Sequence, residues 1–259
     1  MPSYRIEIAD RLTHHFRVTV TLQAPAAEQG LSLPVWTPGS YLVREFARHL
    51  SGIEARQGSR NVRLEQTDKT RWVAHCSGSA ALQVSYRVYA FDTSVRAAFL
   101  DAERGFFNGT SLCLRAEGHE ATPHRIELAP LPRDWQVATA MTPVPGRARL
   151  YEAADYDELV DHPVEMGTFW RGRFDARGVP HEFVVAGAHA PFDGERLLAD
   201  AQRICEAQIA FWHGRSAKAR PPFGRYLFAL NTVEEGRGGL EHRASTALLA
   251  PQRSSIRSS

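Results

Sequence analysis

The chain has 259 residues, of which 43% are hydrophobic and 23% are charged, as in ordinary globular proteins. Its 31 basic and 29 acidic residues give a net charge of +2, too small for long-range attraction to nucleic acid or to an anionic membrane. No stretch approaches the roughly 18 apolar residues of a membrane span, and residues 1–16 lack the apolar core of a signal peptide. We therefore expect no nucleic-acid partner, no membrane contact and a cytoplasmic location.

Apolar and polar residues alternate through the first part of the chain. The segments with this period of two, which is typical of half-buried strands, are residues 4–8, 16–22, 82–88 and 126–128. Turn residues separate them, and Asn108-Gly109 predicts a type I′ hairpin turn. No strong helical period precedes residue 155. These patterns predict a β-sandwich-like domain over residues 1–160.

Residues 161–259 mix strands with a helix. Segments typical of strands are residues 169–174, 181–186, 225–233 and 245–250, with a hairpin turn at Ala176-Arg177-Gly178. Between them, Asp193 is a candidate helix N-cap, an apolar stripe runs from Leu197 to Trp212, and Gly214 is a candidate stop. This order predicts an α/β or α+β unit, with the polar end of the chain, residues 252–259, expected to fray.

Motifs for metal or phosphate binding are absent from the sequence. A zinc-peptidase helix needs His-Glu-x-x-His, because residues four apart share one helix face. His119-Glu120 is followed by Pro123 and by a histidine at the wrong spacing, whereas His181-Glu182 leads into a strand pattern. The three cysteines, Cys76, Cys113 and Cys205, form no C-x-x-C motif and indicate isolated thiols in a reducing compartment. We expect no metal site.

Five segments in order carry a more specific signal. They are Trp36 to His49, Val84 to Arg96, Leu100 to Thr110, Asp155 to Gly167, and Gly238 to Leu248. Together they resemble the glycyl aminopeptidase family, zinc metallopeptidases that in full length carry a C-terminal PDZ domain. The resemblance implies a mainly β fold, in which an N-terminal β-sandwich-like domain precedes a thermolysin-like catalytic domain.

That catalytic domain is expected to be incomplete. In the family, the zinc helix with His-Glu-x-x-His lies downstream of the Gly-Gly-Leu-Glu-His block, and this chain ends first, with residues 254–259 departing from the family pattern. Whether the chain is a natural truncation, a cloned fragment or a frameshifted reading stays open. The resemblance implies zinc in the intact family member, and neither zinc nor a catalytic residue in this chain.

The block from Gly238 to His242 is similar to the Gly-x-Met-Glu-Asn element of the aminopeptidase N family, whose glutamate binds the free α-amine of the substrate. By this resemblance Glu241 binds the amine of a peptide, while Gly238, Gly239 and Leu240 run along its backbone. Phe107 and Asn108 are further candidate substrate contacts, from a loop on a rigid scaffold. The alternative interpretations are a solvated turn carboxylate for Glu241 and a plain hairpin turn for Asn108.

The resemblance implies an N-terminal fragment of an aminopeptidase that removes N-terminal Gly or Ala from peptides with a free N-terminus, and we expect it to be inactive alone. The alternative is a non-catalytic β-rich module that binds peptides or proteins. Apolar surface exposed on the incomplete domain predicts self-association. We interpret Trp36, Tyr41, Arg44 and Arg48 as an interdomain or core-edge network with arginines over the rings.

Overall fold

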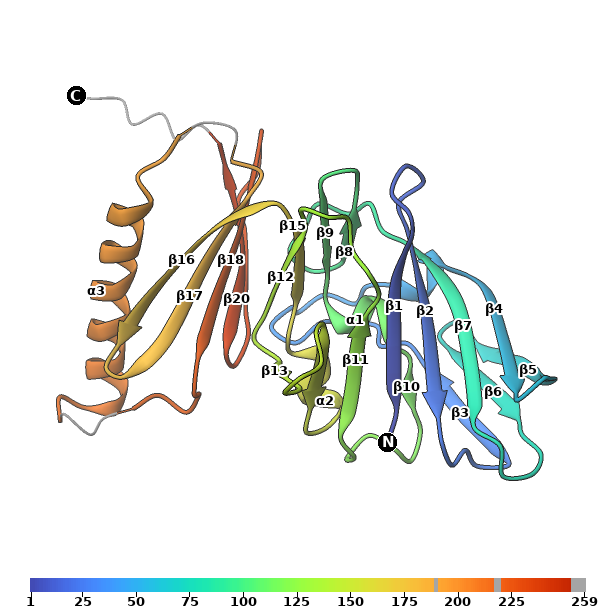
Figure 1. Ribbon diagram of the computed structural model, residues 1–259. Coiled ribbons are helices and arrows are strands. Elements are labelled where there is room, and N and C mark those ends of the chain that lie inside the picture. Colours follow the sequence, from blue (N-terminus) through green and yellow to red (C-terminus); the bar gives the residue numbers. More distant parts are fainter. Residues whose placement is uncertain (189–190, 217–219, 253–259) are drawn as a thin grey trace.

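A computed structural model describes residues 1–188, 191–216 and 220–252 (Figure 1). These residues form three β-sheets and few helices, which confirms the prediction of a mainly β protein. The end of the chain, where we predicted fraying and a departure from the family pattern, lies outside the described residues from 253 onward. No helix in the described ranges has the length and apolarity needed to cross a membrane.

The largest sheet has eleven strands in the order β10-β3-β6-β5-β4-β7-β2-β1-β11-β14-β13. Their bounds are β1 (Ser3–Asp10), β2 (His15–Leu22), β3 (Glu28–Ser32), β4 (Leu50–Gln57), β5 (Arg60–Asp68), β6 (Arg71–His75), β7 (Leu82–Tyr89), β10 (Arg115–Ala116), β11 (His124–Leu128), β13 (Thr142–Pro143) and β14 (Leu150–Ala153). The predicted alternation is confirmed in β2, where Phe16, Val18, Val20 and Leu22 are all buried. One face of this sheet therefore forms the main core.

A four-stranded sheet completes the first part of the chain, in the order β12-β15-β9-β8. It consists of β8 (Ala98–Leu100), β9 (Arg104–Phe107), β12 (Gln136–Thr139) and β15 (Val164–Gly167), and short helices η1 (Phe46–His49), α1 (Gly109–Leu112) and α2 (Tyr156–Val160) lie between strands of these two sheets. Because β15 pairs with β9 and β12, the first part extends to Gly167.

The predicted hairpin turn at Asn108-Gly109 is wrong. Asn108 has extended φ and ψ angles of −90° and 141°, and Gly109 begins α1, whereas a type I′ turn requires positive φ at both residues. The Asn108 side chain instead donates a hydrogen bond of 2.9 Å to the carbonyl of Val95. Gly109 is needed for close packing, since a Cβ there would lie 3.0 Å from the Cα of Val160.

The third sheet begins at Phe169 and has five strands in the order β16-β17-β18-β20-β19. They are β16 (Phe169–Ala176), β17 (Val179–Ala186), β18 (Tyr226–Val233), β19 (Gly238–Glu241) and β20 (Ser245–Pro251). The predicted β16–β17 hairpin is confirmed, with positive φ at Arg177 and Gly178. Strands β17, β18 and β20 are parallel, and the two edge strands run antiparallel to their neighbours.

Helix α3 (Gly194–His213) covers only part of one face of this sheet (Figure 1). Its predicted ends are confirmed: the Asp193 side chain accepts a hydrogen bond from the backbone N–H of Arg196, and Gly214 ends the helix with φ of +90°. The apolar stripe is only partly packed, because Phe211 and Trp212 are 77% and 72% exposed.

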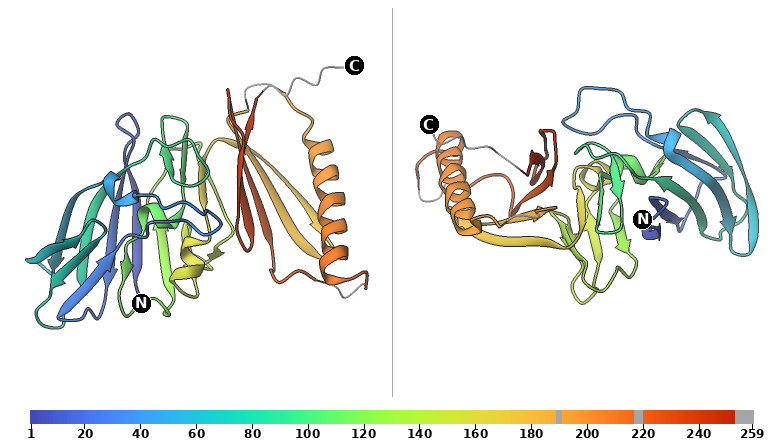
Figure 2. Two further views of the ribbon diagram at one scale, coloured as in Figure 1. Left: turned by 180° about the vertical axis from the view of Figure 1, so that it is seen from behind. Right: turned by 90° about the horizontal axis from the view of Figure 1, so that it is seen from above.

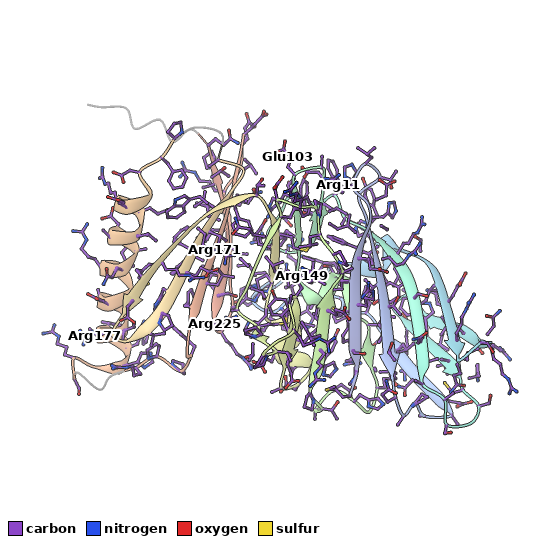
Figure 3. All side chains as sticks on the ribbon, viewed as in Figure 1. Arg11, Glu103, Arg149, Arg171, Arg177 and Arg225 are labelled. Atoms are coloured by element: carbon purple, nitrogen blue, oxygen red, sulfur yellow. The ribbon has the colours of Figure 1, made fainter. Side chains whose placement is uncertain are left out.

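The opposite face of the five-stranded sheet packs on the first part of the chain, as the two views in Figure 2 show. Phe169, Val184 and Ala229 share a buried apolar cluster with Ala138 and Ala140. Arg171 of β16 and Arg225, which directly precedes β18, reach across this joint, and Figure 3 labels both. Arg171 donates to the carbonyl of Val137 at 2.7 Å, and Arg225 donates to the carbonyl of Thr139 at 2.8 Å. The two parts are thus joined by apolar and polar contacts.

Candidate functional site

The candidate site lies at β19, an edge strand of the third sheet. Among the described residues β19 pairs only with β20, in register from Gly238 opposite Leu249 to Glu241 opposite Thr246. Leu240 points into the protein and is 1% exposed, whereas Glu241, at the end of the strand, is exposed. The strand is therefore a sheet edge with an exposed carboxylate at its end, and a sheet edge is where a peptide adds by β-augmentation.

The two glycines of β19 have open space beside them. A Cβ on Gly238 would meet no atom closer than 4.0 Å, and one on Gly239 would make only ordinary contacts, the nearest at 3.4 Å. Neither residue has a positive φ. The packing of the described residues therefore does not require glycine at position 238, and the missing side chain leaves room for another chain to approach the backbone.

A loop from the first part of the chain lies against β19. We call residues 35–44 the Trp36 loop; the backbone N–H of Arg44 donates to the carbonyl of Val35 and closes it. Gly39 in this loop has φ of +83°, and a Cβ there would lie 2.9 Å from the carbonyl oxygen of Glu241. The loop is held from below by the hydroxyl of Thr37, which donates to the carbonyl of Arg96 at 3.1 Å. In Figure 2 the blue segment after β3 extends toward the red strands.

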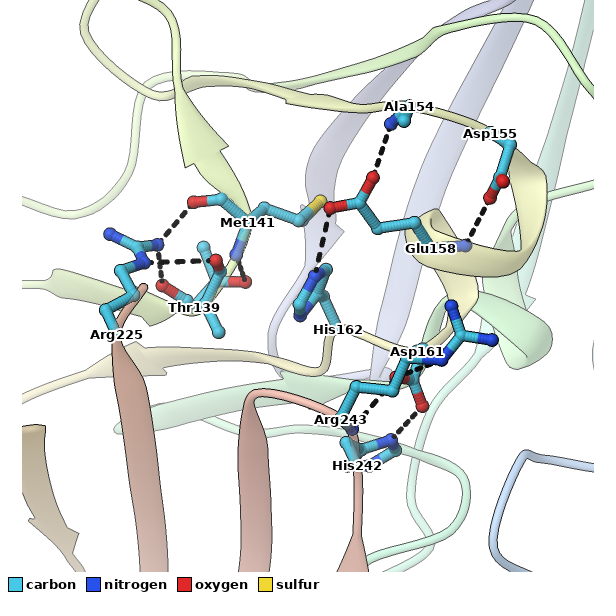
Figure 4. A network of polar contacts seen from close by, with 11 residues as sticks. Thr139, Met141, Ala154, Asp155, Glu158, Asp161, His162, Arg225, His242 and Arg243 are labelled. Atoms are coloured by element: carbon cyan, nitrogen blue, oxygen red, sulfur yellow. Dashed lines mark hydrogen bonds and ion pairs between the residues drawn. The ribbon is translucent and has the colours of Figure 1, made fainter. Parts of the chain in front are cut away.

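A buried polar pair holds the turn that follows Glu241 (Figure 4). Nδ1 of His242 donates to Oδ1 of Asp161 at 3.0 Å, and the backbone N–H of Arg243 donates to Oδ2 of Asp161 at 3.0 Å. The His242 and Asp161 side chains are 0% and 8% exposed. Burial acts to raise the pKa of Asp161, but the hydrogen bonds from His242 and Arg243 outweigh it and the net pKa is lowered. Asp161 is therefore held as a carboxylate.

Two more histidine nitrogens at this joint are buried without a hydrogen-bond partner among the described residues, Nε2 of His242 and Nδ1 of His162. Nε2 of His162 lies 3.7 Å from Glu158, and burial is the main cause that lowers the pKa of His162. Within residues 1–188, 191–216 and 220–252 no three His, Cys, Asp or Glu side chains are grouped to hold a metal ion. These described residues therefore do not offer a ligand set that fits zinc.

Phe107 and Asn108 lie in the core rather than on the open side of β19. Both are 0% exposed, and Phe107 packs edge-on against Phe16 with ring centroids 5.9 Å apart. The neighbouring Phe106 shares a buried cluster with Leu240. The segment therefore supports β19 from beneath, and substrate contact by Phe107 or Asn108 stays a prediction.

The interpretation of Trp36, Tyr41, Arg44 and Arg48 as a network of rings and arginines is wrong. Tyr41 is fully exposed and Trp36 is 53% exposed. Across the described part of the chain, the arginines placed over aromatic rings are Arg104 and Arg171. Arg44 instead reaches Ser40, and Arg48 reaches its neighbour His49. These contacts stay within the Trp36 loop and η1.

Residues that sequence reasoning did not assign to the site are Gly39, Arg96 and Asp161. Arg96 donates to the carbonyl of Gly239 at 3.5 Å, from 143 positions earlier in the chain. Asp161 lies 81 positions before His242. No spacing rule connects residues so far apart, although Gly39, Arg96 and Asp161 all fall inside the five segments that carry the family resemblance.

Comparison with known proteins identifies one matching protein family and several similar structures. The sequence profile of the peptidase M61 N-terminal domain matches residues 3–168. Among curated protein sequences, none matches the chain significantly. An aminopeptidase N family protein from Idiomarina loihiensis is 38% identical and superposes with a TM-score of 0.91 over 100% of this chain. The chain spans only 44% of that protein.

More distant structures share the fold at low sequence identity. A variant of an M1 zinc metallopeptidase from Deinococcus radiodurans, bound to a Tyr-Ser-Ala substrate, is 14% identical with a TM-score of 0.53; the match covers 99% of this chain and 60% of that one. Aminopeptidase A from Legionella pneumophila, in complex with aspartic acid, is 9% identical with a TM-score of 0.53 over 95% of this chain and 30% of its own.

Proposed function

The chain belongs to the family of the peptidase M61 N-terminal domain, and on that premise we propose that it is the N-terminal part of a zinc-dependent aminopeptidase. In this proposal the chain supplies the strand that aligns the substrate and the carboxylate that binds its free N-terminus. The third sheet, from Phe169 onward, then belongs to the beginning of the catalytic domain, for which the sequence patterns suggest residues 161–259. The substrates are peptides with an N-terminal Gly or Ala, and the enzyme works in the cytoplasm.

The observation that carries the proposal is the exposed carboxylate of Glu241 at the end of β19, an edge strand that pairs only with β20 among the described residues. A peptide can add to β19 through backbone hydrogen bonds. Its α-ammonium group then needs an anion at the end of the strand, and an ionised carboxylate makes a hydrogen bond about twice as strong as a neutral acceptor does. The open space beside Gly238 allows the peptide backbone to approach closely.

The chemistry of peptide cleavage is outside what these residues provide. The sequence holds no His-Glu-x-x-His, and the described residues hold no cluster of metal ligands. We therefore propose that this chain alone binds a peptide N-terminus without hydrolysing the peptide. Chelator-sensitive release of glycine from Gly-Gly-Gly by the purified chain with zinc would contradict this part of the proposal.

Peptide binding is tested by titrating the protein with peptide and monitoring the titration by NMR. The tripeptide Ala-Ala-Ala is compared with its N-acetylated form, which keeps the backbone and removes the positive charge. We expect the free peptide to bind more tightly, and Glu241→Gln to reduce its affinity about tenfold or more, because a hydrogen bond to a charged group contributes roughly 1.5–3 kcal/mol. Glu235→Gln, another exposed glutamate near β19, is the control and leaves the preference intact. Equal affinity for the two peptides would refute the proposal.

Self-association is a second property that a specific observation favours. Ile204, Phe211 and Trp212 are 61%, 77% and 72% exposed on α3, and exposed apolar patches are typical of interaction surfaces. We propose that copies of this chain associate through α3. The alternative function is a non-catalytic binding module. In that case a peptide would bind along a sheet edge whether or not its N-terminus is free.

A further inference from the structure

We infer that Asp161 is a positioning residue for the amine-binding carboxylate: acting through His242 and the backbone of Arg243, it fixes the turn after β19 so that Glu241 is held at the end of this edge strand. The inference rests on the proposed function of Glu241. It assigns a role in substrate binding to a residue of the α2–β15 connection, outside the five-stranded sheet that carries Glu241.

The geometry is that of a two-point clamp. The carboxylate of Asp161 uses both oxygens: Oδ1 accepts from the imidazole of His242 and Oδ2 accepts from the backbone N–H of Arg243, each at 3.0 Å. These donors belong to the two residues that directly follow Glu241. Since one is a side chain and the other is backbone, the pair fixes both the position and the orientation of the turn.

Burial makes this clamp stronger than a surface contact would be. The side chains of His242 and Asp161 are 0% and 8% exposed, so loss of either partner leaves a buried polar group unsatisfied. The clamp is separate from the exposed side chain of Arg243, whose Nε is 4.0 Å from Asp161 and which is 77% exposed. At that distance, and with the guanidinium of Arg243 in solvent, this ion pair contributes little.

Two further contacts restrict the backbone around Glu241. Gly39 of the Trp36 loop lies against the carbonyl of Glu241, and the backbone N–H of His242 donates to the carbonyl of Ser245 at 2.8 Å, closing the β19–β20 turn. The backbone of Glu241 is thus held on both sides while its carboxylate stays in solvent. Such preorganisation limits the conformational freedom that binding would otherwise have to remove.

The test uses the 259-residue chain and the same pair of peptides, Ala-Ala-Ala and its N-acetylated form. In Asp161→Asn one acceptor oxygen becomes a donor, so His242 can keep its hydrogen bond to this side chain only by moving its ring proton from Nδ1 to Nε2, which is buried without a hydrogen-bond partner among the described residues. We expect the affinity for the free peptide to fall about tenfold, while the affinity for the acetylated peptide, which depends on the strand edge, stays within about twofold.

A matched pair at position 242 separates positioning from folding. The amide N–H of His242→Asn can replace the Nδ1 donor, whereas His242→Leu removes it. We expect His242→Asn to keep the preference for the free amine and His242→Leu to lose it. Arg243→Ala, which leaves the backbone donor in place, is the control and should bind both peptides like the unsubstituted chain. Thermal melts of each variant verify that it is folded at the titration temperature.

The outcomes separate this inference from the proposed function. If the unsubstituted chain prefers the free amine and Asp161→Asn keeps that preference, the inference is overturned and the proposed function stands. If Asp161→Asn or His242→Leu weakens both peptides equally, the role of the clamp is structural only, and the inference is again overturned. If the unsubstituted chain shows no preference for the free amine, the proposed function itself fails, and the inference with it.

Discussion

The contact between the Trp36 loop and β19 yields a prediction whose magnitude follows from the structure. Gly39 has φ of +83°, and a Cβ added there would lie 2.9 Å from the backbone oxygen of Glu241 and 3.1 Å from Cδ1 of Leu240. Gly39→Ala therefore introduces two separate penalties. The left-handed backbone conformation costs a non-glycine residue roughly 1–2 kcal/mol, and the clash with a backbone atom forces the loop or the strand to move.

A second glycine separates the penalty for the left-handed backbone conformation from the penalty for the clash. Gly118 has nearly the same φ, +80°, and a Cβ on it would meet no atom within 4 Å. Gly118→Ala should therefore lower the free energy of unfolding by about 1 kcal/mol, from backbone strain alone. We expect Gly39→Ala to lower it by about 2–4 kcal/mol, the excess being of the size found for overpacking. The excess measures the contact of the loop with β19.

The assay is urea-induced unfolding followed by tryptophan fluorescence and by circular dichroism. Coincident transitions by the two probes are needed before free energies are compared, because a chain with three sheets can unfold in steps. Gly39→Ala should also weaken binding of the free Ala-Ala-Ala peptide, since it displaces the backbone that carries Glu241. Equal destabilisation by Gly39→Ala and Gly118→Ala would refute the contact on which this reasoning depends.

Three further predictions concern two buried polar groups and the exposed apolar side chains of α3. Arg104→Ala should lower the free energy of unfolding by about 3–5 kcal/mol in urea titrations. It leaves the carboxyl group of Glu165 buried without its ion-pair partner, since this side chain is 3% exposed and its Oε1 lies 2.6 Å from Nε of Arg104. Replacing both residues by Met should recover most of this loss, and additive losses would contradict the reasoning. Burial lowers the pKa of His124, so the free energy of unfolding should fall as the pH falls below about 6.5, the pKa of histidine in the unfolded chain. His124→Asn should reduce this dependence of the free energy of unfolding on pH. An unchanged dependence would assign the effect to other histidines. Replacing Phe211 and Trp212 by Ser should shift sedimentation-velocity profiles toward monomer, whereas an unaltered profile would exclude α3 as the contact surface.

Local patterns in the sequence were sufficient to predict the elements that local physics determines. The alternation in β2, the β16–β17 hairpin with its positive φ at Arg177 and Gly178, and the caps of α3 at Asp193 and Gly214 are all confirmed. Each depends on residues within about four positions of one another, because alternation, turn conformation and capping are short-range effects.

Features determined by distant partners were not predictable in the same way. Asn108 and Gly109 have the composition of a hairpin turn, yet the carbonyl of Val95 and the backbone of Val160 determine their conformation. The parallel pairing of β1 with β11 joins Ser3 to Arg125 and has no local signature. At the candidate site, the motif in the sequence pointed to Glu241, whereas the contacts of Asp161 with His242 and Arg243 were not predictable, since a buried carboxylate and its partners meet only in three dimensions.

The third sheet ends in β19, and three described residues of the first part, Gly39, Arg96 and Asp161, contact this strand or the turn after it. Recombination that joins residues 1–168 of one relative to the sheet of another would therefore change the surroundings of Glu241 while every strand kept its own sequence. Chimeras should retain peptide binding only when these three positions and the β19–β20 segment come from the same parent. The surroundings of Glu241 thus depend on contacts between both parts of the chain. In a library of hybrids joined between Gly167 and Phe169, we expect peptide binding in those hybrids whose two parts preserve these contacts.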